Sequence, residues 1–322
     1  MNAENPGPDM EKMVMEFLAV KRAKNNPRST TAVLKFGQAA YHFKTGDGDL
    51  GVEAERLKKA GEAIQMASVS SVSYVHYDRQ MNVLVTRYVE GESLFNKLWN
   101  AFSFWKPEKK FLAGFAATAG AIGKWLRAFH ELERGAEKGN ADACKRSLLE
   151  NIAKKSDGIL RYGGGILSQK QIEGVAAFAE STLEDPSWSR PAVCAVHGDF
   201  SPSNILLGER GGCFVADFGN VHAGFSWEDA ARFWSGLWEI FDARLRRRYF
   251  IGEAMEAFLR AYGFDEQAAS LPAWNVLRAN NSLTRIHEFV KPGFQVSWRL
   301  NRIFRKLAAP HLVWLKKIGS GR

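Results

Sequence analysis

The chain has few cysteines and no long apolar segment. Cys144, Cys194 and Cys213 are widely spaced in its 322 residues and form no CxxC pair. Such a set favours neither a disulfide framework nor a zinc site, so we expect a cytoplasmic protein. The longest weakly polar run, Phe111 to Gly123, is too short to span a bilayer, and the first residues lack the basic start and apolar core of a secretory signal.

Acidic residues are scarce at the carboxyl end. The whole chain carries a net charge of +9, and residues 271–322 contain ten Lys and Arg against the single Glu288. In the tail, residues 295–322, apolar residues recur at near-helical spacing among basic ones, as at Leu300, Phe304 and Leu307. This basic amphipathic pattern has two interpretations: the apolar stripe packs on the rest of the protein, or the helix lies at the inner face of a membrane.

The composition is that of an ordinary globular protein. Hydrophobic residues make up 46% of the chain and charged residues 25%, and no internal repeat or low-complexity tract is visible. A chain of this length can bury a large core and is expected to divide into two parts.

One stretch in the second half concentrates acidic and amide side chains. His197 to Gly219 reads HGDFSPSNILLGERGGCFVADFG, with Asp199 and Asn204 five residues apart and Asp217 after the next predicted strand. Phosphoryl transfer needs Mg²⁺ held by oxygen ligands, which suits Asn204 and Asp217. It also needs a carboxylate that accepts the proton of a hydroxyl, which suits Asp199. The stretch therefore predicts a phosphoryl-transfer site.

The pattern HGDxxxxN, followed by a hairpin and DFG, resembles the aminoglycoside phosphotransferase and choline kinase family of the protein-kinase-like fold. Protein kinases usually have Arg where this chain has Gly198. The resemblance implies a bilobal α+β fold, with residues 1–90 as a nucleotide-binding lobe made of a small antiparallel sheet and one helix. Residues 91–322 would form a larger, mainly helical lobe for catalysis and substrate binding. It also implies ATP and Mg²⁺ as cofactors.

Alternating or clustered apolar residues and turn signals locate the expected elements of the smaller lobe. A helix is expected from Asp49 to Ala67, with Val52, Ala60 and Ile64 on one face. Antiparallel strands are expected over residues Met13–Lys24, Thr31–Phe36, Ala40–Thr45 and Val83–Val89.

The resemblance also implies a strand lysine that binds nucleotide phosphates and a helix glutamate that orients it. Lys44 in YHFK and Glu53 in VEAERL are the first choices. Lys35 and Glu55 remain alternatives, because strand and helix registers slip easily when they are read from sequence.

A third implied contact is with the adenine. In LVTRYVEGESL, the backbone of Tyr88 and Val89 would meet the edge of the base. No GxGxxG motif precedes Lys44, and the turn from Asn25 to Ser29 contains no glycine, so the way in which the phosphates are covered differs from that in protein kinases.

The larger lobe is expected to contain helices over Phe111–Leu132, Asp142–Ile152 and Gln169–Leu183. His130 resembles a frequent family position, but a packed or surface histidine is the favoured interpretation. Asp229, in SWEDAARF, resembles the family's acid that hydrogen-bonds back to the catalytic loop; a favourable charge at a helix amino terminus is the alternative.

These features predict a kinase that acts on the hydroxyl of a small molecule. Aminoglycosides are polycations, so the basic carboxyl end favours a neutral or anionic acceptor, and we expect a sugar, glycan or lipid-linked saccharide. An aminoglycoside or choline kinase remains an alternative. A non-catalytic kinase-like module at a membrane is a second class, which the presence of Asp199, Asn204 and Asp217 together disfavours. No nucleic-acid partner is expected.

Overall fold

The computed structural model describes residues 9–23, 30–46, 48–101, 108–132, 134, 140–209, 211–243, 248–265, 267–291 and 298–320. The chain divides into two compact units. Unit 1 consists of Met1–Glu92 and Leu206–Val221, and unit 2 consists of Ser93–Ile205 and His222–Arg322. Unit 1 thus includes a hairpin from the second half of the chain. The predicted domain boundary near residue 90 stays a prediction.

Unit 1 is built on a four-stranded antiparallel sheet with the strand order β1-β2-β5-β4. The strands are β1 (Thr30–Phe36), β2 (Ala39–Thr45), β4 (Tyr74–Asp78) and β5 (Val83–Arg87). Along β2, Tyr41 and Phe43 face one core, while His42 and Lys44 point to the opposite side because side chains alternate along a strand. The predicted strands at Thr31–Phe36, Ala40–Thr45 and Val83–Val89 are confirmed within one or two residues.

The predicted first strand is wrong, because its described part is helical. Helix α1 spans Met10–Ala23, while Lys24 and the predicted turn at residues 25–29 lie outside the described residues. Met13, Val14 and Phe17 are spaced for one face of a helix and are buried against the sheet. Unit 1 therefore has two described helices instead of the one expected.

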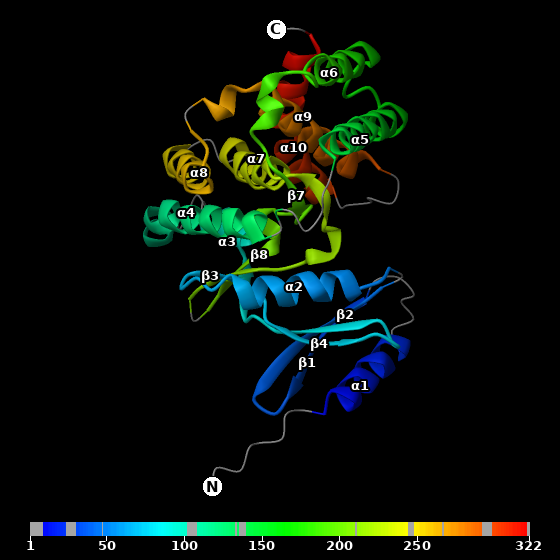
Figure 1. The fold of residues 1–322 in the computed structure, drawn as a ribbon, viewed down its shortest axis with the longest axis vertical. Coiled ribbons are helices and arrows are strands. Elements are labelled where there is room, and N and C mark those ends of the chain that lie inside the picture. Colours follow the sequence, from blue (N-terminus) through cyan, green and yellow to red (C-terminus); the bar gives the residue numbers. More distant parts are fainter. Residues whose placement is uncertain are drawn as a thin grey trace. The chain divides into compact units, whose positions relative to one another are not determined.

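Helix α2 (Gly51–Ala63) covers the other face of the sheet, so α1 and α2 lie on opposite faces (Figure 1). Leu50 and Ala54 pack on Leu84, whereas Val52, expected on the buried face, has 52% of its surface exposed. A helix register that buries Ala54 and Leu57 turns Val52 outward. Unit 1 also contains β3 (Val69–Ser71), which pairs in parallel with β9 (Cys213–Val215).

The strands β3, β9, β8 (Ile205–Gly208) and β6 (Gly91–Ser93) form a second sheet in that order. Strands β8 and β9 are the hairpin predicted before DFG, and they are confirmed. Cys144, Cys194 and Cys213 are buried.

Unit 2 is mainly helical, and the three helices predicted there from sequence are confirmed. One of them, α6, begins with a capping box, in which the Ser168 hydroxyl accepts a hydrogen bond from Gln171 N and the Gln171 side chain accepts one from Ser168 N. The short strands β7 (Val193–Val196) and β10 (His222–Phe225) pair antiparallel. The helices are α3 (Leu94–Ala101), α4 (Lys109–Leu132), α5 (Ala141–Tyr162), α6 (Gln169–Ser181), α7 (Trp227–Ala243), α8 (Arg248–Tyr262), α9 (Pro272–Val290) and α10 (Trp298–Gly319).

An aromatic cluster anchors the predicted catalytic loop to the helices of unit 2. Phe200, which follows Asp199, is fully buried and stacks on Trp125 of α4 with ring centroids 6.1 Å apart. Phe200 also contacts Phe233 of α7, with ring centroids 5.6 Å apart. The loop is therefore fixed by burial immediately beside its acidic residue.

The part of helix α10 whose side chains are described, from Leu307 onward, packs inside unit 2. Helix α10 contacts α6, α7 and α9, and Leu307 and Leu315 are buried, while Lys316 and Lys317 are exposed. This favours the first interpretation of the amphipathic pattern for residues 307–320. Among the described helices, none is both long and apolar enough to cross a membrane.

The helical state of α1 can be tested with two substitutions. Phe17 is fully buried and Met15 is 55% exposed, although a strand would turn both to the same side. We expect Phe17→Ala to lower the free energy of unfolding by about 3–5 kcal/mol and Met15→Ala by less than about 0.5 kcal/mol, measured by urea denaturation. Equal losses would contradict the helix.

Candidate active site

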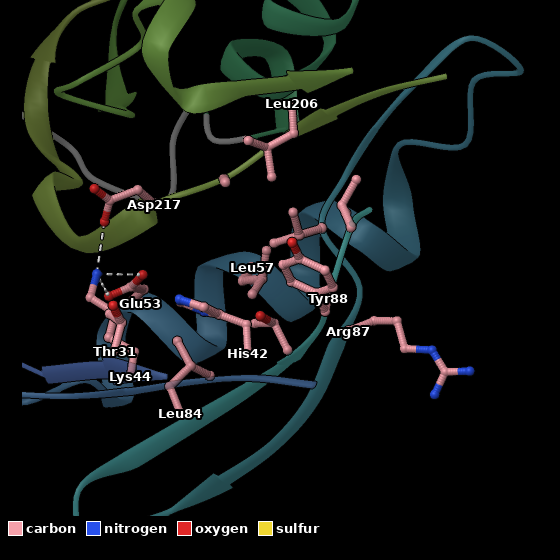
Figure 2. Close-up of a pocket in the computed structure, with 14 residues that line it drawn as sticks. Thr31, His42, Lys44, Glu53, Leu57, Leu84, Arg87, Tyr88, Leu206 and Asp217 are labelled. Carbon is pink, nitrogen blue, oxygen red and sulfur yellow. Dashed lines mark hydrogen bonds and ion pairs between the residues drawn. The ribbon is translucent and has the colours of Figure 1, made fainter. Parts of the chain in front are cut away.

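A cavity of about 420 Å³ lies in unit 1, large enough for a small-molecule ligand. Lys44, Glu53 and Asp217 stand close together at its wall (Figure 2). Most of the other lining residues are apolar; the full set is Thr31, His42, Leu57, Val72, Leu84, Thr86, Arg87, Tyr88, Val89, Leu206 and Ala216. An apolar pocket with a few charged groups at one place suits a ligand that has a flat ring and an anionic end.

The Lys44 ammonium is held by two carboxylates. Its Nζ donates to Glu53 Oε1 and Oε2 at 3.0 and 2.8 Å and to Asp217 Oδ1 at 2.7 Å. Burial acts to lower the pKa of Lys44, but Asp217 and Glu53 outweigh it and raise the pKa, so the lysine stays charged. The alternatives Lys35 and Glu55 are both exposed, and it is Lys44 and Glu53 that pair.

Two backbone features let Asp217 reach this lysine. Asp217 has a φ of 65° and a ψ of 66°, a left-handed conformation that costs about 1–2 kcal/mol in a residue with a side chain. At Gly219 a Cβ atom would lie 3.0 Å from Glu53 Oε2 and 3.2 Å from Lys44 Nζ. The glycine of DFG therefore leaves room for the three charged groups.

Tyr88 and Val89 line the same cavity, as expected for residues that meet a base. The Tyr88 N–H already donates to Ala40 O at 3.0 Å, so the Tyr88 carbonyl and the Val89 N–H are the better candidates for an edge contact. Sequence reasoning did not single out His42. Burial and the charge of Lys44 lower the pKa of His42, which keeps the ring neutral inside the cavity.

The catalytic loop lies in unit 2, and Asn204 fixes Asp199 within it. Asn204 Nδ2 donates to the Asp199 carbonyl at 2.9 Å and to Asp199 Oδ2 at 3.0 Å. This assignment leaves the amide oxygen of Asn204 free to act as a ligand. Gly198 has a φ of 78°, a conformation that glycine adopts without strain, which explains glycine at this position.

Asp229, in the first turn of α7, holds the catalytic loop by hydrogen bonds. Its carboxylate accepts hydrogen bonds from His197 N at 2.6 Å and Gly198 N at 2.9 Å and contacts His130 Nε2 at 2.9 Å. Burial acts to raise the pKa of Asp229, but the hydrogen bond and charge of His130 outweigh it and lower the pKa. The predicted hydrogen bonds between Asp229 and the catalytic loop are confirmed, and His130 is a packed residue that braces the aspartate.

Sequence reasoning missed Arg232, which binds the proposed base. Arg232 Nε and Nη2 donate to Asp199 Oδ1 at 3.1 and 2.7 Å. Arg232 follows Asp229 by three residues on α7, so the two share a helix face. That spacing was a usable signal, because Asp229 was already expected to face the loop.

A chain of ion pairs continues from Arg232 into the core. Arg232 Nη2 lies 3.5 Å from Glu288 Oε1, and Arg285 binds both Glu288 at 2.7 Å and the buried Glu239 at 2.7 and 2.9 Å. His311, also buried, contacts Glu239 Oε1 at 3.0 Å. Burial acts to raise the pKa of Glu239, but these partners lower it to about 2. The carboxylate is therefore charged at neutral pH.

The tryptophans of this region pack against one another and against Arg278. Trp274 is 1% exposed, and the Arg278 guanidinium carbon lies 4.2 Å from the ring centroids of both Trp234 and Trp314. These rings fill the interface between α7, α9 and α10.

A comparison with protein families identifies the chain. The model of the phosphotransferase enzyme family, APH, matches residues 69–268, which include the catalytic loop, DFG and Asp229. The chain belongs to the phosphotransferase enzyme family. The predicted resemblance is confirmed, and no curated protein matches this phosphotransferase in sequence.

Solved structures share the fold of this phosphotransferase at low sequence identity. A glucosamine kinase has a TM-score of 0.58 and 11% identity, over 94% of this chain and 84% of that chain. A thermostable mutant of aminoglycoside phosphotransferase APH(4)-Ia has a TM-score of 0.55 and 13% identity, over 95% and 98%. Choline kinase LicA from Streptococcus pneumoniae has a TM-score of 0.51 and 14% identity, over 94% and 99%. The predicted α+β, protein-kinase-like fold class is confirmed.

The role of Lys44 in this phosphotransferase can be tested by nucleotide affinity. Removing one charged contact to phosphate is expected to raise the Kd of ATP about 10- to 100-fold in Lys44→Met, measured by calorimetry. Lys35→Met is the matched control, because Lys35 is exposed on β1. If Lys35→Met weakened the binding of ATP as much as Lys44→Met does, the assignment of Lys44 as the phosphate-binding lysine would be wrong.

The buried ion pairs predict a pH dependence. The pKa of Glu239 is about 2 in the folded state and about 4.3 when unfolded, so its stabilisation is complete above pH 4.3 and is lost as the pH falls toward 2. Glu239→Gln should lower the free energy of unfolding by about 3–5 kcal/mol at pH 7, because it leaves Arg285 without its buried partner.

This difference between wild type and Glu239→Gln should shrink by about 1 kcal/mol at pH 3.5, measured by urea unfolding. Glu256→Gln, which changes an exposed glutamate of α8, is the control and should show no such pH dependence. A difference that stays constant between pH 7 and pH 3.5 would contradict the lowered pKa.

Proposed function

We propose that this phosphotransferase moves the γ-phosphate of ATP to a hydroxyl of a sugar or glycan, with Asp199 as the base. The observation that carries the proposal is the fixed carboxylate of Asp199, which Asn204 orients through two hydrogen bonds. The acceptor oxygen forms a bond to the γ-phosphorus as the bond to the β,γ-bridging oxygen breaks. ADP leaves, and the acceptor proton passes to Asp199.

Nucleotide binding is assigned to unit 1. Lys44 would contact the phosphates, Glu53 would hold Lys44 in place, and the backbone of Tyr88 and Val89 would meet the adenine at the apolar part of the cavity. One similar structure, with a TM-score of 0.56 and 12% identity, is a glucosamine kinase in complex with glucosamine, ADP and inorganic phosphate. This supports ATP as the phosphate donor.

Asn204 and Asp217 are the proposed ligands of Mg²⁺. An amide oxygen and a carboxylate are hard oxygen donors of the kind that Mg²⁺ prefers, so the residues present fit the ion. Among the described residues, no group of three or more His, Cys, Asp or Glu side chains could hold a metal alone. Phosphate oxygens and water would therefore complete the coordination, and the bound ion would neutralise charge on the transferred group.

The side chains beside Arg232, the partner of Asp199, are polar and suit a neutral, hydroxyl-bearing acceptor. Arg232 lines a small cavity of about 30 Å³ in unit 2, the size of a water molecule, together with hydroxyl and amide side chains, among them Ser201, Ser235 and Asn281. Asn281 is 9% exposed. Amide and hydroxyl groups can donate to and accept from the neighbouring hydroxyls of a sugar.

The alternatives for the acceptor receive less support. Aminoglycosides and choline are cations, whereas this chain has a net charge of +9, and a cationic residue already occupies Asp199. A similar structure is an aminoglycoside phosphotransferase with hygromycin B, with a TM-score of 0.57 and 11% identity. A lipid-linked acceptor and membrane contact stay predictions. The burial of Leu307 and Leu315 in unit 2 means that these two residues of the amphipathic tail are not exposed for contact with lipid.

The decisive experiment compares acceptors with γ-labelled ATP and Mg²⁺. Neutral sugars, glycolipids, aminoglycosides and choline are offered to the wild type, to Asp199→Asn and to Asp157→Asn, which changes an exposed aspartate of α5. We expect labelled sugar with wild type and Asp157→Asn, and a kcat about 10²–10⁴-fold lower with Asp199→Asn. Equal turnover by Asp199→Asn would exclude Asp199 as the base.

A further inference from the structure

Arg232 covers one oxygen of Asp199 in a partly buried setting. The two donors of Arg232 both reach Asp199 Oδ1, and the exposed fractions are 12% for Arg232 and 27% for Asp199. Asn204 occupies Oδ2. The two Arg232 donors use both lone-pair positions of Oδ1, whereas Asn204 uses only one of Oδ2, so an acceptor hydroxyl can still bind Oδ2 while both partners stay in place.

The neighbouring carboxylates are also paired with cations. Glu288 is held by Arg232 and Arg285, and Glu239 is held by Arg285 and His311. An ammonium group of an incoming acceptor would therefore meet guanidinium groups before it met an unpaired carboxylate in this part of unit 2. Polycation recognition requires the opposite arrangement.

A lysine of the protein lies within the electrostatic influence of Arg232. Lys155 on α5 is partly buried, and its Nζ donates to Asn280 Oδ1 at 3.1 Å. Burial and then the positive charge of Arg232 lower the pKa of Lys155 to about 8, against the weaker opposing effect of Glu228 and Glu288. Arg232 thus adds to burial in destabilising the charged form of this ammonium.

We propose that Arg232 is a specificity-determining residue that excludes cationic acceptors from Asp199 and leaves access to neutral hydroxyls. The proposal rests on the proposed function, in which Asp199 is the base. Arg232 acts by charge and by occupying Asp199 Oδ1. Without it, the carboxylates of Asp199 and Glu288 would each lose a cationic partner and would attract ammonium groups.

The test measures cation affinity and acceptor choice separately. Kanamycin, a polycationic aminoglycoside, is titrated by calorimetry into the full-length wild type and into Arg232→Gln, Arg232→Met and Arg232→Lys. We expect the Kd of kanamycin to fall at least about tenfold in the Gln and Met variants and to change less than about threefold in the Lys variant, which keeps the charge. Arg146→Gln, which changes an exposed arginine of α5, controls for net charge and should leave the Kd unchanged.

The second readout is the ratio of kcat/KM for a neutral sugar and for its amino-substituted analogue, such as glucose and glucosamine. We expect wild type to prefer the neutral sugar and the ratio to shift at least about tenfold toward the amine in Arg232→Gln. Thermal unfolding verifies that the variants are folded. Arg232→Gln and Arg232→Met both remove the charge, so the test can be made if only one of them folds.

The outcomes separate this proposal from the proposed function. If wild type binds kanamycin as tightly as Arg232→Gln and Arg232→Met do, Arg232 does not exclude cations and the inference is overturned, even if a sugar is phosphorylated. If no sugar is phosphorylated but the affinity for kanamycin rises in both variants, the charge exclusion stands and the proposed acceptor is wrong.

Discussion

The buried carboxylate of Asp229 is the interaction on which the catalytic loop depends. It accepts two backbone hydrogen bonds from the loop while His130 supplies a third contact, so three donors converge on one desolvated anion. Such charge-assisted bonds fix the backbone on both sides of a left-handed glycine. Phe200 then anchors the loop on the side of the helices, which leaves Asp199 little freedom to turn away. The direction of the base is therefore set by groups that never touch a substrate.

Both units hold the carboxylates of the proposed site in ion pairs. In unit 1, Lys44 lies between two acids, and in unit 2, Arg232 binds the acid proposed as the base. A phosphate that reaches Lys44 would compete with Asp217 for the same ammonium, which would free the aspartate for a metal ion. The pairs thus compensate charges that would otherwise be costly to bury, and they also position groups that must later exchange partners.

Sequence patterns predicted the parts of this protein that depend on short, ordered motifs. The motifs HGDxxxxN and DFG indicated Asp199, Asn204 and Asp217, because the chemistry needs fixed residue types at fixed spacing. The family resemblance predicted that Asp229 hydrogen-bonds to the loop. The sequence patterns led to wrong or incomplete predictions where the structure depends on which side chains become buried. Helix α1 was read as a strand because a short apolar run fits either period until its partner surface is known. Arg232 was missed because the helix face of Asp229 was not followed one turn further, to the side chain that reaches a loop residue 33 positions earlier.

The composition of unit 1 from two separate segments has a consequence for biosynthesis. Three residues that line the cavity of unit 1, Leu206, Ala216 and Asp217, emerge from the ribosome more than 100 residues after Glu92, at which the first segment ends. Strand β3 lacks its partner β9, and β6 lacks its partner β8, until then. The four-stranded sheet can form early, but the second sheet stays incomplete while the helices α3 to α6 are translated. Vectorial synthesis leaves this intermediate exposed to chaperones and to wrong strand pairing, a risk that a circularly permuted chain with both segments adjacent would avoid.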